Sequence, residues 1–312
     1  MYEDETCLHR NHNFCLMRAF TENGTAAHGR RLQLNDVTSL MQVRGMNHLS
    51  HAHPIRGAPS FVTSSVHFEW CMHFERFQVD DFVAELSQKR GNCVVYDVGM
   101  NDGFYTMLSA AMGCRVHAFD VQDMCVEIAR RFVILNHFTN VTVVHQPVSA
   151  NHDEKLAIPS LQACDGGFTF SGAAANATPG TRLGHLGIPL VSKREFRTIS
   201  LDVYVPPGTV IDMLKIDTEG HEPLVLRGAQ TLFRSRRIRR AWIETNPSPS
   251  PTSWRSFNLL HRIMTWGYAA RVVGNGPCPR DVFYAKDWTR FHAYLLDPTR
   301  NHMCVDVLLS LT

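Results

Sequence analysis

The stretch Val94-Val-Tyr-Asp-Val-Gly-Met-Asn-Asp-Gly-Phe-Tyr-Thr-Met-Leu108 decides the fold. A short apolar run ends in Asp97, and two glycines then flank Asn101 before a helical pattern begins. Gly99 lets the chain turn sharply and lets a ligand approach bare backbone. Gly103 opens a helix whose free N–H groups favour a carboxylate or a phosphate. The stretch therefore predicts a strand, a ligand-binding turn and a helix.

Strands and helices alternate on both sides of this turn. Strands are predicted at 93–97, 115–120, 141–144, 210–217, 239–244, 268–273 and 282–284, and helices at 80–91, 104–112, 121–138, 223–233 and 254–266. Apolar strands that alternate with helices imply right-handed crossovers and a parallel sheet. We therefore expect an α/β fold with a mostly parallel, seven-stranded sheet and helices on both of its faces.

The chain divides near residue 65. The first 60 residues are rich in His and poor in Val and Ile, whereas residues 92–148 are rich in both β-branched types. Because these residue types favour strands, we expect a weakly structured arm over 1–65 and one α/β domain over 66–312. The Gly-rich connection 150–197 interrupts the alternation, and loops of this length are usually functional or disordered. We expect it to select the substrate.

Composition and charge exclude several classes of protein. Lys+Arg 31 against Asp+Glu 29 gives a formal charge of +2, which disfavours a nucleic-acid or membrane-surface partner. No segment is long and apolar enough to span a bilayer, and the N-terminus lacks the apolar region of a signal peptide. The 9 cysteines include no C-x-x-C pair, which favours free thiols, a reducing compartment and a cytoplasmic location.

The turn and the strand after it favour a positively charged nucleoside ligand. Asp120 ends that strand, where an acid suits the two hydroxyls of a ribose. The turn lacks the G-x-G-x-x-G pattern of dinucleotide sites, and its acids Asp97 and Asp102 would repel phosphate but attract an ammonium or sulfonium cation. S-Adenosylmethionine has all of these groups. The residues that we assign to this cofactor are Asp97, Gly99, Asn101, Gly103, Asp120 and Gln146.

These motifs, with a third further along the chain, resemble those of one family. Val95–Thr106 and Val116–Asp120 look like the first two motifs of the FkbM-type methyltransferases, and Leu214–Glu222 looks like their central signature. The resemblance runs from about 75 to 290 and implies a Rossmann-like class I methyltransferase fold. Members are S-adenosylmethionine-dependent O-methyltransferases, several of which act on sugars or other hydroxylated metabolites. The resemblance thus implies O-methylation of a small-molecule or glycan acceptor.

Four candidates for the chemistry of methyl transfer cluster at the end of the strand 210–217. An alcohol needs a base or a metal to remove its proton, and Lys215, Asp217, Glu219 and His221 are placed to help. Lys215 and Asp217 share one face of the strand, so a structural ion pair explains them equally well. Glu219 is as well suited to capping the next helix as to contacting substrate, and His221 is a candidate base.

Other interpretations remain beside this one. Asp217, Glu244 and Asn246 end neighbouring strands and could bind Mg²⁺ through oxygen ligands, although we assign no metal. A non-catalytic relative would keep the pocket as a binding module, and a nicotinamide-dependent dehydrogenase would share the architecture. The five arginines of Arg234–Arg240 indicate a solvated face at the N-terminal edge of the sheet, or else a nuclear signal or an anion-binding patch. The Pro-rich loop 246–251 is expected to border the acceptor.

Overall fold

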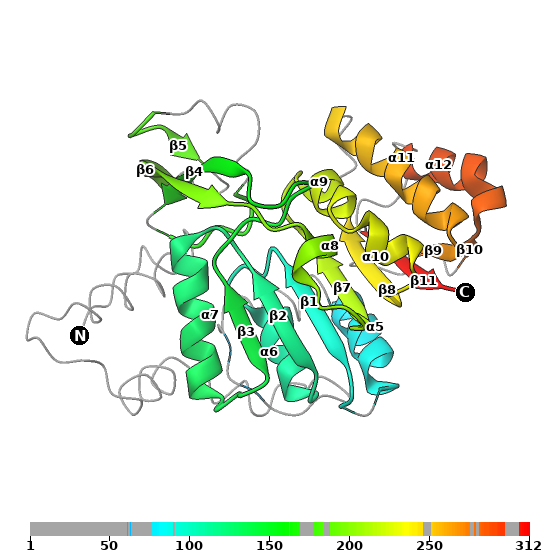
Figure 1. The fold of residues 1–312 in the computed structure, drawn as a ribbon, viewed down its shortest axis with the longest axis horizontal. Helices are drawn as coiled ribbons and strands as arrows, with labels where there is room; N and C mark the ends of the chain where they lie inside the picture. Colours follow the sequence, from blue (N-terminus) through cyan, green and yellow to red (C-terminus); the bar gives the residue numbers. More distant parts are fainter. Residues whose placement is uncertain are drawn as a thin grey trace, which may run out of the picture.

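The computed structural model describes residues 61, 63, 76–89, 91–161, 163–168, 178–183, 188–245, 251–274, 278, 281–296 and 306–312. These residues form an α/β fold in which helices flank a central sheet (Figure 1). The arm predicted over 1–65 lies outside the described residues except for Phe61 and Thr63, and so does the loop 246–250.

The central sheet has eight strands. Their spatial order is β10 (Val282–Phe283), β9 (Tyr268–Val273), β11 (Asp306–Leu311), β8 (Arg240–Glu244), β7 (Met213–Ile216), β1 (Val94–Val98), β2 (Arg115–Phe119) and β3 (Val141–Val144). Only β10 and β11 run antiparallel to their neighbours, which confirms the mostly parallel sheet. The sheet exceeds the predicted seven strands by β11. A short apolar run does not reveal its partners, so the insertion of β11 between β8 and β9 had no signal in the sequence.

Helices cover both faces of the sheet, as predicted. Their bounds are α5 (Arg76–Ser87), α6 (Phe104–Ala111), α7 (Asp123–Leu135), α8 (Leu201–Tyr204), α9 (Glu222–Arg227), α10 (Gln230–Arg234), α11 (Pro251–Thr265) and α12 (Trp288–Leu296). Helices α5 to α7 pack with Val95 and Trp242, whereas α8 to α12 pack with Tyr96 and Ile243 on the opposite face. None of the helices in the described part of the chain is long and apolar enough to cross a membrane.

The helix predicted over 223–233 is divided into α9 and α10 at Gly228. A Cβ on Gly228 would lie 2.1 Å from the carbonyl oxygen of Ser149, so only glycine fits there. The carbonyl oxygen of Gly228 accepts bonds from Ser200 Oγ (2.9 Å) and from the backbone N–H of Asp202 (2.7 Å). Contacts with a distant segment therefore end α9, and the helical pattern of the sequence alone does not contain them.

The connection predicted as a long loop over 150–197 contains a small antiparallel sheet. Its strands are β4 (Lys155–Leu161), β6 (Ile188–Arg197) and β5 (Arg182–Leu183), in that order across the sheet. In Figure 1 this inserted sheet lies above α7, at the upper left. Most of the described side chains of β6 are exposed, and the pair Lys155–Glu195 (3.0 Å) joins this strand to β4. An exposed strand carries little hydrophobic periodicity, which is why the prediction missed it.

Disulfides overturn the prediction of free thiols. Cys93 bonds Cys114, directly before β1 and β2, and Cys125 on α7 bonds Cys164. Cys278 is disulfide-bonded as well. The fold brings these residues together from distant positions, so their spacing in the sequence did not reveal them. Disulfides persist in oxidising compartments, and the argument for a cytoplasmic location therefore loses its basis.

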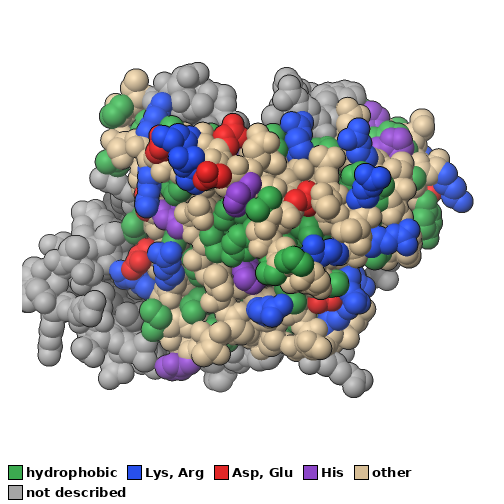
Figure 2. Space-filling view, in the orientation of Figure 1, with side chains coloured by type: hydrophobic (Ala, Val, Ile, Leu, Met, Phe, Trp, Pro, Cys, Tyr) green, Lys and Arg blue, Asp and Glu red, His purple; other side chains and the backbone are tan. Residues whose placement is uncertain are grey.

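The arginine run Arg234–Arg240 is tied to the rest of the molecule at its C-terminal end. Arg240 Nε lies 2.6 Å from Glu85 Oε2, and Arg239 Nε lies 3.5 Å from Asp212 Oδ1. Basic side chains are interspersed with acidic ones on the molecular face in Figure 2 and form no continuous stripe there. These contacts favour a structural role for the arginine run at the edge of the sheet and argue against an anion-binding patch.

Candidate active site

The two glycines of the turn after β1 are required by close packing. Gly99 has a φ of 81°, and a Cβ on it would lie 1.7 Å from the carbonyl oxygen of Asp217. Gly103 has a φ of 94°, and its Cβ would lie 3.2 Å from Ala129 Cβ on α7. The chain itself fills the space that the sequence attributed to a ligand at Gly99. The turn is therefore held directly against the end of β7.

The turn fixes the carboxylate at the end of β2. Asp120 Oδ2 accepts a bond from the backbone N–H of Asn101 (2.9 Å), and its Oδ1 accepts one from that of Gln122 (2.8 Å). Burial raises the pKa of Asp120 to about 6, although both of these bonds lower it. Asp97 Oδ2 accepts a bond from Thr106 Oγ1 on α6 (2.6 Å). Three predicted cofactor residues thus meet where β1 and β2 end.

Gln146, the remaining predicted cofactor residue, has a different environment. Its Nε2 donates to the carbonyl oxygen of Arg197 at the end of β6 (3.1 Å). This bond connects the segment after β3 with the inserted sheet. Gln146 thus contributes to the join between the two sheets.

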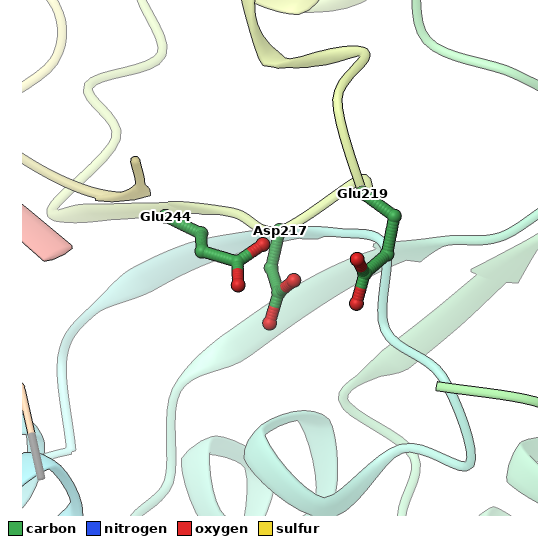
Figure 3. Close-up of side chains that lie close together, drawn as sticks. All are labelled: Asp217, Glu219 and Glu244. Carbon is green, nitrogen blue, oxygen red and sulfur yellow. The ribbon is translucent and has the colours of Figure 1, made fainter. Parts of the chain in front are cut away.

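Three carboxyl groups meet at the ends of β7 and β8. Oxygen atoms of Asp217, Glu219 and Glu244 all lie within 4.8 Å of one another. Figure 3 shows these side chains directed to the same side of the chain, with that of Asp217 between the other two. Lys215 Nζ donates to Asp217 Oδ2 (2.7 Å) and lies 4.9 Å from the ring centre of Tyr105. We call Asp217, Glu219 and Glu244 the carboxylate cluster.

Burial and mutual repulsion raise the pKa values of two members of the carboxylate cluster. Burial and the charge of Asp217 raise the pKa of Glu219 to about 8. The charge of Asp217, followed by burial, raises the pKa of Glu244 well above its usual range. Such shifts mean that the cluster binds protons at neutral pH, or else attracts a cation that replaces them. The site suits a positively charged ligand.

The same cluster has the composition of a candidate cation site. Two members of the predicted trio, Asp217 and Glu244, do lie together, with Glu219 as the third acid. Asn246 lies outside the described residues. Carboxylate oxygens are the ligands that Mg²⁺ prefers, so these three groups are the ones that could hold it.

Glu222 shapes the loop between β7 and α9, a role that the sequence did not reveal. Its Oε1 accepts bonds from the backbone N–H of Thr218 (2.8 Å), Thr218 Oγ1 (3.0 Å) and the backbone N–H of Gly220 (3.1 Å). Glu219 lies inside this loop with a φ of 52°. The sequence did contain a signal for this role of Glu222. It is an acid in the first turn of a helix, and the helix N-terminus attracts negative charge. Glu222, not Glu219, binds the loop amides and thereby fixes where Glu219 points.

His221 lies at the start of α9 in a buried environment. Its Nε2 lies 3.3 Å from Ser149 Oγ, and burial lowers its pKa to about 4. The imidazole is therefore neutral at pH 7, and burial opposes its taking up a proton. This environment opposes protonation of His221 and so weakens it as a base.

The strand order, the glycine turn after β1 and the acid at the end of β2 are those of a class I methyltransferase fold. Within that class the chain belongs to the FkbM methyltransferase family. The methyltransferase FkbM domain matches residues 97–270, which is more than half of the chain. Among curated proteins, no sequence is similar to this chain.

Solved structures that match the chain include several methyltransferases. A Streptococcus mutans protein assigned as a methyltransferase, solved with SAH, has 10% identity and a TM-score of 0.39, and the match covers 70% of this chain and 88% of that one. An rRNA methylase from Streptococcus thermophilus has 13% identity, a TM-score of 0.38 and coverages of 81% and 100%. The human methyltransferase 10 domain containing protein has 13% identity, a TM-score of 0.37 and coverages of 89% and 98%. Similarity at this level carries no information on the methyl acceptor.

Binding of S-adenosylhomocysteine is expected to strengthen about tenfold between pH 5 and pH 7. The folded pKa of Asp120 is about 6, above that of an unfolded Asp, so its ionised fraction rises through this interval. Ribose hydroxyls donate to the ionised form. The raised pKa also means that Asp120 adds to stability below pH 4 and that this contribution is lost as pH rises through 6. Calorimetric titration at five pH values measures the affinity.

The Asp120→Asn variant is the control for this pH dependence. It is expected to bind more weakly than the parent at pH 7 and to show a flat profile. A parent profile that is also flat between pH 5 and pH 7 would remove Asp120 from the cofactor site.

Proposed function

We propose that the chain is an S-adenosylmethionine-dependent O-methyltransferase that acts on a hydroxyl of a sugar or other small hydroxylated metabolite. One observation carries the proposal. A fixed carboxylate, Asp120, and the carboxylate cluster lie at the same edge of the sheet, after β2 and after β7 and β8. Open α/β sheets bind their ligands at this edge.

The residues at this edge fit S-adenosylmethionine. Asp120 offers acceptor oxygens to a ribose, and the N-terminus of α6, which begins after Gly103, suits an α-carboxylate. The excess of acid around Asp217 suits the ammonium and sulfonium charges. When bound, the cofactor supplies a methyl group that the acceptor oxygen can attack in line.

Glu219 is the group that we assign to the acceptor proton. It is half-buried, and its carboxyl belongs to the cluster at the end of β7. A carboxylate with a raised pKa is a stronger base than an ordinary one once it is ionised, and a nearby positive charge promotes that ionisation. Lys215 Nζ donates to Asp217 Oδ2 (2.7 Å), so a cationic side chain lies beside the acids of the cluster.

A small neutral acceptor agrees with the charges of the chain. The formal charge is +2, and the arginines of Arg234–Arg240 are partly engaged in structural contacts. An RNA acceptor would instead require a basic surface beside the carboxylate cluster. The test is incubation of the purified chain with methyl-labelled cofactor and a cell extract, with the labelled product identified by mass spectrometry. Label in nucleic acid alone would overturn the assignment of the acceptor.

Two other functions predict different results in the same assays. A binding module would hold S-adenosylhomocysteine tightly and transfer no methyl group to any acceptor in a broad hydroxylated panel. A nicotinamide-dependent dehydrogenase would be stabilised against heat by NADH and not by S-adenosylhomocysteine. Stabilisation by S-adenosylhomocysteine together with methyl transfer supports the proposal against both.

Chelation is expected to leave turnover unchanged within about twofold. A side-chain base at Glu219 needs no ion, whereas Mg²⁺ bound by the carboxylate cluster would activate the hydroxyl directly. Initial rates are measured before and after dialysis against EDTA. Loss of turnover that Mg²⁺ restores would assign Asp217, Glu219 and Glu244 to a metal instead.

A further inference from the structure

The start of α7 is fastened to the inserted segment beside the cofactor site. Gln122 Nε2 donates to the carbonyl oxygen of Asp165 (3.0 Å), and its Oε1 accepts a bond from the backbone N–H of the same residue (2.9 Å). A turn of helix later, Cys125 is disulfide-bonded to Cys164. Both attachments follow directly after Asp120. Residues 163–168 are thus joined covalently to α7, the helix that follows β2 and Asp120.

The disulfide also lies against the side chain of Asn101. Asn101 Oδ1 lies 2.7 Å from Cys164 Sγ and 3.6 Å from Cys125 Sγ. Next to the disulfide, a Cβ on Gly166 would lie 2.9 Å from Asn101 Nδ2, so that glycine also packs on the amide. Cys125 is fully buried, and Cys164 is 5% exposed. The amide of Asn101 is therefore confined by the disulfide and by the backbone that the disulfide holds in place.

Asn101 also contacts Asp120, the carboxylate that we assign to the cofactor. Its backbone N–H donates to Asp120 Oδ2 (2.9 Å), and its φ of 54° lies in the left-handed region, which Asn adopts more readily than most residues. Loss of the disulfide would leave the segment around Gly166 attached to α7 through the Gln122–Asp165 bonds and would loosen its packing on the Asn101 side chain. The N–H bond to Asp120 would then lose its fixed donor.

We propose that the disulfide between Cys125 and Cys164 is a positioning link of the cofactor site, and that its reduction weakens cofactor binding. The proposal rests on the proposed function, because S-adenosylhomocysteine is the probe. Reduction by a dithiol breaks the Sγ–Sγ bond and adds two electrons and two protons, giving two thiols. The dithiol loses the same electrons and protons as it closes to its own cyclic disulfide.

The chain has a second disulfide that serves as a matched control. Cys93 and Cys114 are bonded directly before β1 and β2, at the opposite ends of the strands from the turn and Asp120. We compare the full-length parent, Cys93→Ser/Cys114→Ser and Cys125→Ser/Cys164→Ser. Each is titrated with S-adenosylhomocysteine before and after treatment with dithiothreitol, and alkylation followed by mass spectrometry verifies the state of each cysteine.

Reduction is expected to raise the Kd of the parent and of Cys93→Ser/Cys114→Ser at least tenfold. The Cys125→Ser/Cys164→Ser variant is expected to bind at least tenfold more weakly than the parent before any reductant and to respond no further. A Cys125→Ser/Cys164→Ser variant that binds as tightly as the parent would overturn the proposal.

Loss of folding is separated from loss of positioning by a second variant. Cys125→Ala/Cys164→Ala keeps apolar side chains at both buried positions and removes the bond. A cooperative thermal transition with weakened binding supports the positioning link. If neither variant folds where Cys93→Ser/Cys114→Ser does, the bond only holds the fold together and the proposal is wrong.

Hydrogen exchange separates failure of this proposal from failure of the proposed function. If the oxidised parent does not bind S-adenosylhomocysteine, the proposed function fails, and exchange in peptides that cover 99–103 and 163–168 then decides about the disulfide. Faster exchange confined to these peptides in Cys125→Ala/Cys164→Ala supports the positioning link. Unchanged exchange in both peptides overturns it.

Discussion

Replacement of Glu219 by Gln is expected to lower the turnover number between about 10²- and 10⁴-fold, the range that a general base contributes. The amide keeps the size of the side chain but does not accept the acceptor proton. The affinity for S-adenosylhomocysteine is expected to stay within about threefold, since Asp120 and the turn at Gly99–Gly103 are unchanged. Single-turnover rates with labelled cofactor measure the chemical step, and titration calorimetry measures the affinity.

Glu195→Gln is the matched control for Glu219→Gln. Glu195 lies on β6 with its side chain 62% exposed and pairs only weakly with Lys155 across a solvated surface. The same change of charge there is expected to leave turnover and affinity unaltered. A loss of less than tenfold in Glu219→Gln would show that another group takes the proton, and a parallel loss of affinity would place Glu219 on the cofactor.

Replacement of Gly99 by Ala is expected to destabilise the fold by about 3 kcal/mol or more. A left-handed φ of 81° costs a non-glycine residue about 1 kcal/mol, and the new Cβ would lie 1.7 Å from the Asp217 carbonyl oxygen, which forces β1 and β7 apart. For a domain of this size, that loss corresponds to a decrease in Tm of roughly 6–12 °C. Thermal unfolding followed by circular dichroism measures it.

Gly208→Ala separates the clash from the backbone strain. Gly208 has a φ of 79°, close to that of Gly99, but a Cβ on it would meet no atom of the described residues within 4 Å. Its replacement is expected to cost about 1 kcal/mol, because only the conformational term remains. Equal decreases in Tm for both variants would contradict the close approach of the turn to β7.

The residues around Gly99 show how much of the site could be predicted. A strand, a glycine turn, a helix and Asp120 at the next strand end are local patterns, and the sequence contains all of them. The sequence predicted that Gly99 makes room for a ligand. In the structure, Gly99 makes room for the carbonyl oxygen of Asp217, which follows a strand far along the chain. The same holds for Glu222, whose three donors define the loop only once β7 and α9 are in place.

The cysteines and the inserted sheet show what local patterns do not contain. Cys125 and Cys164 are 39 residues apart, and nothing in their flanking residues indicates a bond. Strand β6 is mostly exposed, so its apolar residues do not alternate clearly. β11 pairs with β8 and β9 although it is last in the chain.

The sequence by itself determined the class of fold, the glycine turn after β1 and the family, because each depends on hydrophobic periodicity, glycines and acids that are neighbours in the chain. The tertiary structure alone decided that Glu219 joins the predicted pair of Asp217 and Glu244, that Glu222 holds the loop, and that a disulfide lies against Asn101. These are contacts between strand ends and between segments far apart in sequence. Burial and mutual charge, which set the pKa values of Asp120 and Glu219, exist only after those segments have packed together.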